Sequence, residues 1–182
     1  MLYQQVSLIA LVDQDEQFER YKTKLLKSQL SQTQLKQIEM QIADFWSQRN
    51  LPIRNGAVSQ SADPFIRAMA LEPQLDGYLH IQNRIRHLQW LAEQDWWQPI
   101  SISKLIRPGM SDPAIPSIVK RLWLLGDSNS SAKSTNQLDP STATSLKRFQ
   151  RRHGLQPDAV IGPETIKWLN VTPKQRASML AN

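Results

Sequence analysis

Acidic side chains that could act together in glycoside cleavage lie close to one another in the C-terminal part of the sequence. They are Asp139, Asp158 and Glu164. Each has a simpler local use, because Asp139 and Glu164 lie where helices are expected to start and Asp158 lies in a predicted turn. We therefore expect this chain not to be an enzyme and to contain no catalytic residue.

Metal and cysteine chemistry are also expected to be absent. His80 and His87 have no nearby carboxylate or third ligand at any recognised zinc spacing. The sequence contains no cysteine, which excludes disulfides, thiolate zinc sites and cysteine nucleophiles within it. We expect the chain to use no metal ion and no cofactor.

Basic side chains crowd residues 147–153, whose sequence is KRFQRRH. The whole chain carries a formal charge of +6 and has a pI near 9.8, which favours anionic partners such as nucleic acid, lipid head groups or an acidic wall polymer. Charge alone does not rank these partners. The candidate ligand-binding residues are basic or aromatic side chains of this half of the chain: Arg148, Arg151, Arg152, Arg107, Arg121, Trp123 and Trp168.

Structural roles remain open for all of these candidates. The arginines could form a solvated helix face, because the dipole of a helix favours cations near its C-terminus. Trp123 and Trp168 could be packing residues. Phe149 lies among the basic residues, and we assign it to the core.

A helix that begins near Pro140 is needed to present the basic segment. Asp139 can cap its first turn, and proline at the first helical position loses no hydrogen bond. Apolar residues then recur at helical spacing. Gly154 can adopt the left-handed conformation that closes a helix, and Leu155 can fold back onto the last turn as in a Schellman cap.

Two further helices complete a small unit around this segment. Pro163 opens one helix, which carries Ile166, Trp168 and Leu169. The sequence at residues 111–113, Ser-Asp-Pro, opens the other, whose apolar residues recur at helical spacing until Gly126 ends it. Residues from about 104 to 171 are thus predicted to form a three-helix unit, a size that is viable as an independent fold.

The ordered features of this unit are similar to those of the small peptidoglycan-binding domain found beside many bacterial cell-wall enzymes. They are L-I-R-P-G at 105–109, L-G-D at 125–127, and L-K-R-F-Q-R-R-H-G-L-x-x-D-x-x-x-G-P-x-T-x-x-x-L-N at 146–170. The resemblance implies a helical fold with peptidoglycan as the partner. The family commonly has Asp-Gly where this chain has Asp158 and Ala159. If the site needs a positive φ, alanine costs about 1 kcal/mol relative to glycine.

The N-terminal half is predicted to be helical as well. A first helix follows Asp13 and Asp15, and a second follows the capping box at residues 31–34. A short helix begins at residues 63–64, and a long one with a continuous apolar stripe covers residues 76–94.

Other stretches of this half are not expected to be helical or membrane-spanning. Residues 51–62 have no periodicity and are predicted to form a loop. Trp96 and Trp97 are more typical of packing than of a sugar-stacking platform. Residues 1–12 are faintly apolar but lack the basic start and cleavage site of a signal peptide. The sequence has no run of about 20 apolar residues, which is the length needed to cross a membrane.

The junction between the halves carries a second resemblance. The run L-E-P-Q-L-D-G-Y-L-H-I at 71–81, followed by W-W-x-P at 96–99, resembles the helical scaffold region of large Gram-negative L,D-transpeptidases. In that family the small domain continues through N-V-P-x-x-R into a catalytic domain, and N-V-T-P-K-Q-R at 170–176 follows that path. The catalytic signature, a histidine and a Ser-His-Gly-Cys cluster, has no counterpart here. The resemblance implies a parent L,D-transpeptidase and a location in the periplasm or cell envelope.

These observations predict an all-α protein with a scaffold region at 1–99, a peptidoglycan-binding-like domain at 100–175, and a tail at 176–182 that leads toward a catalytic domain. The expected function is non-catalytic binding and positioning on peptidoglycan during cross-linking. Other cell-wall proteins are expected as further partners, and nucleic acid is not. Two alternatives stay open: nucleic-acid binding through the basic helix 140–153, and an architectural module that docks another protein, to which Ala159 is the one residue-level pointer.

Overall fold

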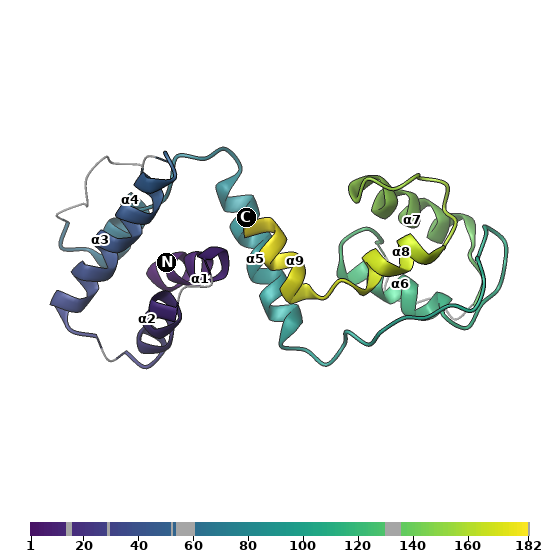
Figure 1. Ribbon diagram of the computed structural model, residues 1–182, viewed down its shortest axis with the longest axis horizontal. Coiled ribbons are helices and arrows are strands. Elements are labelled where there is room, and N and C mark those ends of the chain that lie inside the picture. The colour runs from purple at the N-terminus through teal and green to yellow at the C-terminus, as the bar shows by residue number, and fades with distance from the viewer. Residues whose placement is uncertain (14–15, 29, 52, 54–60, 130–135, 182) are drawn as a thin grey trace. The chain divides into compact units, whose positions relative to one another are not determined.

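The computed structural model describes residues 1–13, 16–28, 30–51, 53, 61–129 and 136–181, and this part of the chain is helical, without strands (Figure 1). The predicted all-α fold is confirmed. Two compact units form, one from Met1–Leu91 with Lys174–Asn182 and the other from Ala92–Pro173. The assignment of residues 1–99, 100–175 and 176–182 to scaffold, binding domain and tail stays a prediction.

Helices α1 to α5 and α9 build the first unit, apart from one residue at the end of α5 and one at the start of α9. Their bounds are α1 Leu2–Asp13, α2 Glu16–Leu26, α3 Gln32–Gln48, α4 Pro64–Ala70, α5 Tyr78–Ala92 and α9 Pro173–Ala181. The predicted capping box is present at the start of α3, where Ser31 and Gln34 exchange hydrogen bonds between side chain and backbone. Asp63 caps α4 through the N–H of Phe65 at 2.8 Å.

Helix α1 was not predicted from the sequence. Its buried residues run continuously from Gln5 to Ala10, so they form no one-sided stripe that a 3.6-residue period could reveal. The predicted stripe of α5 is confirmed by the burial of Ile85, Leu88 and Leu91. Asp15 and residues 52 and 54–60 of the predicted loop lie outside the described residues.

Neither a membrane span nor a metal cluster is found among the described residues. No described helix is both long and apolar enough to cross a bilayer. His80 and His87 are exposed on α5, and no group of three metal-ligating side chains surrounds them in the described ranges.

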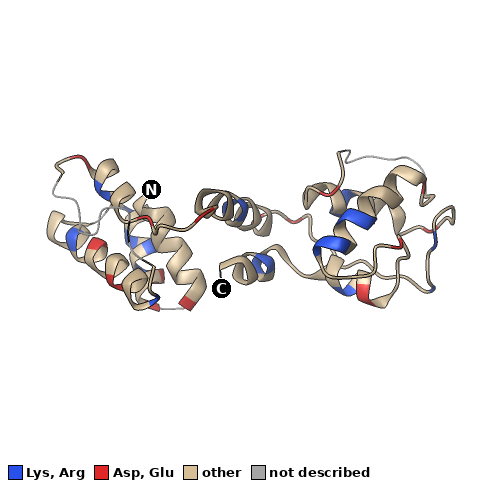
Figure 2. Ribbon diagram, turned by 90° about the horizontal axis from the view of Figure 1, so that it is seen from above, with Lys and Arg blue, Asp and Glu red and all other residues tan. Residues whose placement is uncertain are grey.

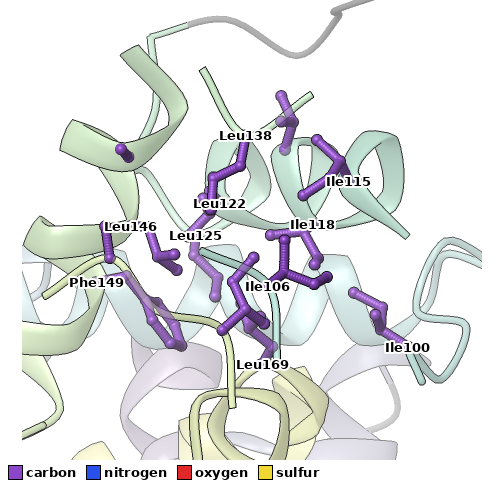
Figure 3. Packing of buried hydrophobic residues seen from close by; sticks show 14 residues of the cluster. Ile100, Ile106, Ile115, Ile118, Leu122, Leu125, Leu138, Leu146, Phe149 and Leu169 are labelled. Atoms are coloured by element: carbon purple, nitrogen blue, oxygen red, sulfur yellow. The ribbon is translucent and has the colours of Figure 1, made fainter. Parts of the chain in front are cut away.

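The second unit packs α6 Ile115–Leu124, α7 Pro140–Arg152 and α8 Pro163–Asn170 around one apolar cluster (Figure 3). Ile118, Leu122, Leu146, Phe149 and Leu169 from the three helices are fully buried in it. The core therefore joins all three predicted helices, and the assignment of Phe149 to the core is confirmed.

Short-range capping sets the ends of α6 and α7. Asp139 accepts a hydrogen bond from the N–H of Thr142 at 2.7 Å, as predicted for the start of α7. At its end, Leu155 N–H donates to Gln150 O at 2.9 Å, and Gly154 has a φ of +68°. These contacts complete the predicted Schellman cap.

The start of α6 lies slightly later than the Ser-Asp-Pro sequence suggested. Asp112 first forms a separate turn, in which Oδ1 accepts from Ala114 N–H at 2.9 Å and its carbonyl accepts from Ile115 N–H at 3.1 Å. The helix proper begins at Ile115 because the aspartate closes this turn before the regular helical bonds start.

Extended segments tie the helices together. Ile106 pairs with Ile161 through two backbone hydrogen bonds of 3.1 and 2.9 Å. The side-chain amide of Asn170 binds both backbone groups of Ile100, accepting from its N–H at 2.9 Å and donating to its C=O at 2.8 Å. The segment before residue 111 is thus bonded to α8 and to the chain before it, and it forms part of the second unit.

Candidate ligand-binding surface

Exposed cations on α7 form the strongest candidate surface. Lys147, Arg148 and Arg151 are exposed, and no described residue forms a hydrogen bond or ion pair with their side chains. Residues three and four apart on a helix are neighbours, so these three side chains share one face. Figure 2 shows several basic positions, in blue, on the helices of the second unit. This surface can offer charge-assisted hydrogen bonds to carboxylates.

Arg152 has a structural role instead. Its guanidinium binds the carboxylate of Asp127 through two contacts, Nε to Oδ1 at 3.2 Å and Nη2 to Oδ2 at 2.5 Å. Asp127 is buried and follows Gly126, where its N–H donates to Leu122 O at 2.8 Å and completes a Schellman cap on α6. The ion pair therefore joins the C-terminal ends of α6 and α7. The sequence L-G-D indicated the end of α6, but no neighbouring residue indicated that Asp127 pairs with Arg152.

Arg121 is also used inside the unit. Only 3% of its surface is exposed. Its Nη1 donates to Leu169 O and its Nη2 to Gln98 O, both at 2.6 Å, and the guanidinium lies 3.7 Å from the ring centre of Trp97. Burial lowers the pKa of Arg121 to about 10, so the side chain stays charged at neutral pH. This placement does not favour Arg121 as a ligand-binding residue.

The tryptophan candidates differ from each other. Trp123 is 42% exposed on α6, so part of its side chain is accessible to a ligand. Trp168 is half-buried and stacks on His153, with ring centres 4.6 Å apart, while His153 contacts the edge of Phe149. Packing therefore explains Trp168. Arg107, the remaining candidate, is exposed at a tight turn in which Met110 N–H donates to Arg107 O.

The three acids have the local uses that the sequence indicated. Asp139 caps α7. Oδ1 of Asp158 accepts from Val160 N–H at 2.8 Å within its turn. Glu164 lies in the first turn of α8 and is exposed, 3.9 Å from Lys167 Nζ.

Gln150 is the structurally important residue that the sequence reasoning missed. It is 1% exposed, and its Oε1 accepts from Ala159 N–H at 2.9 Å while its Nε2 donates to Val160 O at 3.0 Å. Ala159 is buried with a φ of +61°, so this site does require the left-handed conformation. The glutamine supports the turn from the neighbouring helix, which explains how alanine is accommodated there.

Most of the sequence of the second unit matches a known protein-family model. Residues 111–169 match the family model “Putative peptidoglycan binding domain”. No curated protein matches the chain. The matched region contains α6, α7 and α8 up to Leu169, together with the Gln150 turn and the exposed face of α7. The match supports a binding domain for peptidoglycan at residues 111–169.

Proposed function

We propose that the second unit attaches this protein to peptidoglycan without catalysing a reaction. The observation that carries the proposal is the family match over α6–α8, a region whose α7 exposes Lys147, Arg148 and Arg151. The stem peptides of peptidoglycan carry carboxylates, which arginine recognises well through paired N–H donors. Arg148 and Arg151 are the proposed contacts, and Arg107 and Trp123 are further exposed positions.

The affinity of one unit for one stem peptide should be low. Each exposed ion pair contributes at most about 1 kcal/mol and is weakened by salt. The wall presents many copies of the same ligand, so weak attachment suffices for a unit that is tethered to another module. The role proposed here is therefore positioning.

The sequence runs at 71–81, 96–99 and 170–176 support a more specific proposal. The protein would belong with L,D-transpeptidases and would help to place a separate cysteine-containing catalytic domain on the wall during cross-linking, in the periplasm or cell envelope. The first unit would be the scaffold in this arrangement, and other cell-wall proteins would be its further partners. These 182 residues contain no cysteine and cannot supply the nucleophile themselves.

Co-sedimentation of the full chain with purified sacculi tests the proposal. The protein should pellet at low salt and be released as the salt concentration rises. Failure to pellet at low salt would contradict peptidoglycan binding. A gel shift with DNA and RNA at the same salt tests the nucleic-acid alternative, which a steep salt-dependent shift would favour. Analysis of the muropeptides after incubation would expose any hydrolysis.

A further inference from the structure

An open groove of about 530 Å³ lies in the second unit, between residues 99–103 and the start of α6. Hydrogen bonds hold the chain segment that forms one wall of the groove. Asn170 holds the two backbone groups of Ile100, and Arg121 holds the carbonyl of Gln98. Figure 3 shows Ile100 at the edge of the apolar cluster. The groove therefore exists before any ligand arrives.

The walls of the groove are polar because of a two-residue alternation in the sequence I-S-I-S at 100–103. Ile100 and Ile102 pack against the core, while Ser101 and Ser103 are exposed. Ser117 lines the opposite wall from the first turn of α6. The groove thus offers hydroxyl groups that can both donate and accept hydrogen bonds.

Asp112 gives the groove its charge. Among the residues that the structure describes as lining it, Asp112 is the only ionisable one. The side chain is largely buried, since the residue is 8% exposed, and Oδ1 is taken by Ala114 N–H at 2.9 Å. No described residue forms a hydrogen bond to Oδ2. Oδ2 is accessible from the groove, where it can accept a hydrogen bond from a ligand, most strongly from a charged donor.

An anionic ligand is disfavoured at the same place. The amide end of α6 normally attracts anions, but the carboxylate of Asp112 already binds a backbone N–H in the turn that leads into it. A second anion would meet like charge. A cation that carries several N–H donors fits both the carboxylate and the serine hydroxyls.

We propose that this groove binds the primary ammonium group of a diamino acid in the peptidoglycan stem peptide. The ammonium donates to Oδ2 of Asp112, and the hydroxyl groups of Ser101, Ser103 and Ser117 accept from it or bind the neighbouring peptide groups. This inference rests on the proposed function and names a part of the ligand that the cations of α7 do not recognise.

A titration of the full chain with N-acetyl-L-alanyl-γ-D-glutamyl-L-lysine, followed by amide NMR, tests the inference. The backbone signals of Ser101, Ser103, Asp112 and Ser117 should shift, with a Kd on the order of 1 mM. The same peptide acetylated on its side-chain amine should not shift them. Equal binding of the two peptides, or shifts confined to residues outside the groove, would overturn the inference.

Variants at the groove separate charge from fold. Asp112→Asn keeps an oxygen for Ala114 N–H but loses the charge, and it should weaken peptide binding about tenfold. Ser117→Lys leaves Asp112 untouched and places a competing ammonium beside it, which should abolish binding. Glu164→Gln removes an exposed acid outside the groove and should change nothing. Wild-type affinity in both groove variants would contradict the assignment.

Pelleting with sacculi distinguishes this inference from the function on which it rests. If the wild-type chain pellets and the peptide leaves the groove signals unshifted, the groove inference fails and wall binding stands. If the wild-type chain does not pellet, the proposed function fails, and the peptide titration still decides whether the groove selects an ammonium group.

Discussion

The side-chain oxygen of Gln150 accepts a hydrogen bond of 2.9 Å from the backbone N–H of Ala159, inside the second unit. The glutamine amide donates in turn to Val160 O and to Asp158 Oδ1. One side chain on α7 therefore satisfies both ends of the turn that precedes α8. A left-handed alanine costs about 1 kcal/mol relative to glycine. The hydrogen bonds of Gln150 offset that cost.

Replacing Gln150 with leucine should destabilise the second unit by about 1–3 kcal/mol, the cost of one buried group left without a partner. The substitution leaves Ala159 N–H unpaired, whereas Val160 O keeps a hydrogen bond of 3.3 Å from the Thr165 hydroxyl. Urea unfolding, followed through the amide NMR signals of residues 92–173, measures the effect. Gln156→Leu, at an exposed position of the same turn, is the matched control and should stay within about 0.5 kcal/mol of the wild type.

Phe149→Ala should cost about 3–5 kcal/mol, because the ring is fully buried at the centre of the core. A unit of this size has little stability to spare, so we expect its helical signal in circular dichroism to fall at 37 °C. Trp123→Ala removes a larger but 42% exposed ring and should change stability far less. If Phe149→Ala unfolded at the same temperature as the wild type, the central packing role of Phe149 would be refuted.

Helix ends in the second unit could be predicted from the sequence because capping is local. Asp139, Gly126 and Gly154 act on groups within a few residues, so their positions fix where α6 and α7 start or stop. The comparison with Asp-Gly raised the question of a positive φ at Ala159, and the structure answers it with a φ of +61°. These features need no knowledge of which segments meet in space.

Contacts between distant segments could not be predicted in this way. Arg121 reaches a carbonyl 48 residues away, and Arg152 pairs with a carboxylate 25 residues away. Both arginines looked like surface cations because a single sequence does not show what lies opposite a helix face. The groove at Asp112 was missed for the same reason, since its walls come from separate segments.

Substitutions at Arg148, Arg151 and Arg152 should separate binding from stability. Arg148→Ala and Arg151→Ala remove exposed cations and should change the free energy of unfolding by less than about 0.5 kcal/mol while reducing pelleting with sacculi. Arg152→Ala leaves the buried carboxylate of Asp127 without its partner and should cost about 1–2 kcal/mol, a figure already reduced because Arg152 itself is partly exposed. Equal pelleting of the Arg148→Ala/Arg151→Ala double variant and wild type would contradict the proposed contacts.

A buried ion pair in the first unit offers a prediction that is independent of ligand binding. Arg67 Nε lies 3.0 Å from Glu39 Oε1, and the Arg67 guanidinium also donates to the carbonyls of Ser61 and Ala62. Arg67→Met should cost about 3–5 kcal/mol, since it leaves Glu39 charged and buried. Adding Glu39→Leu should recover part of that loss. A double variant less stable than Arg67→Met alone would show that the unpaired carboxylate is not the cause.

Arg121→Lys tests whether the segment before residue 111 belongs to the second unit through its polar contacts. A lysine ammonium on a flexible stem lacks the planar fork with which Arg121 reaches Leu169 O and Gln98 O together. The helices should therefore stay folded while the segment around Gln98 opens more often. Hydrogen exchange at the amide of Ile100, which donates to Asn170 Oδ1, should become faster by about tenfold if the opening free energy falls by about 1.4 kcal/mol. Exchange at Leu122, inside α6, should change much less, and an equal acceleration at both amides would instead indicate loss of the whole unit.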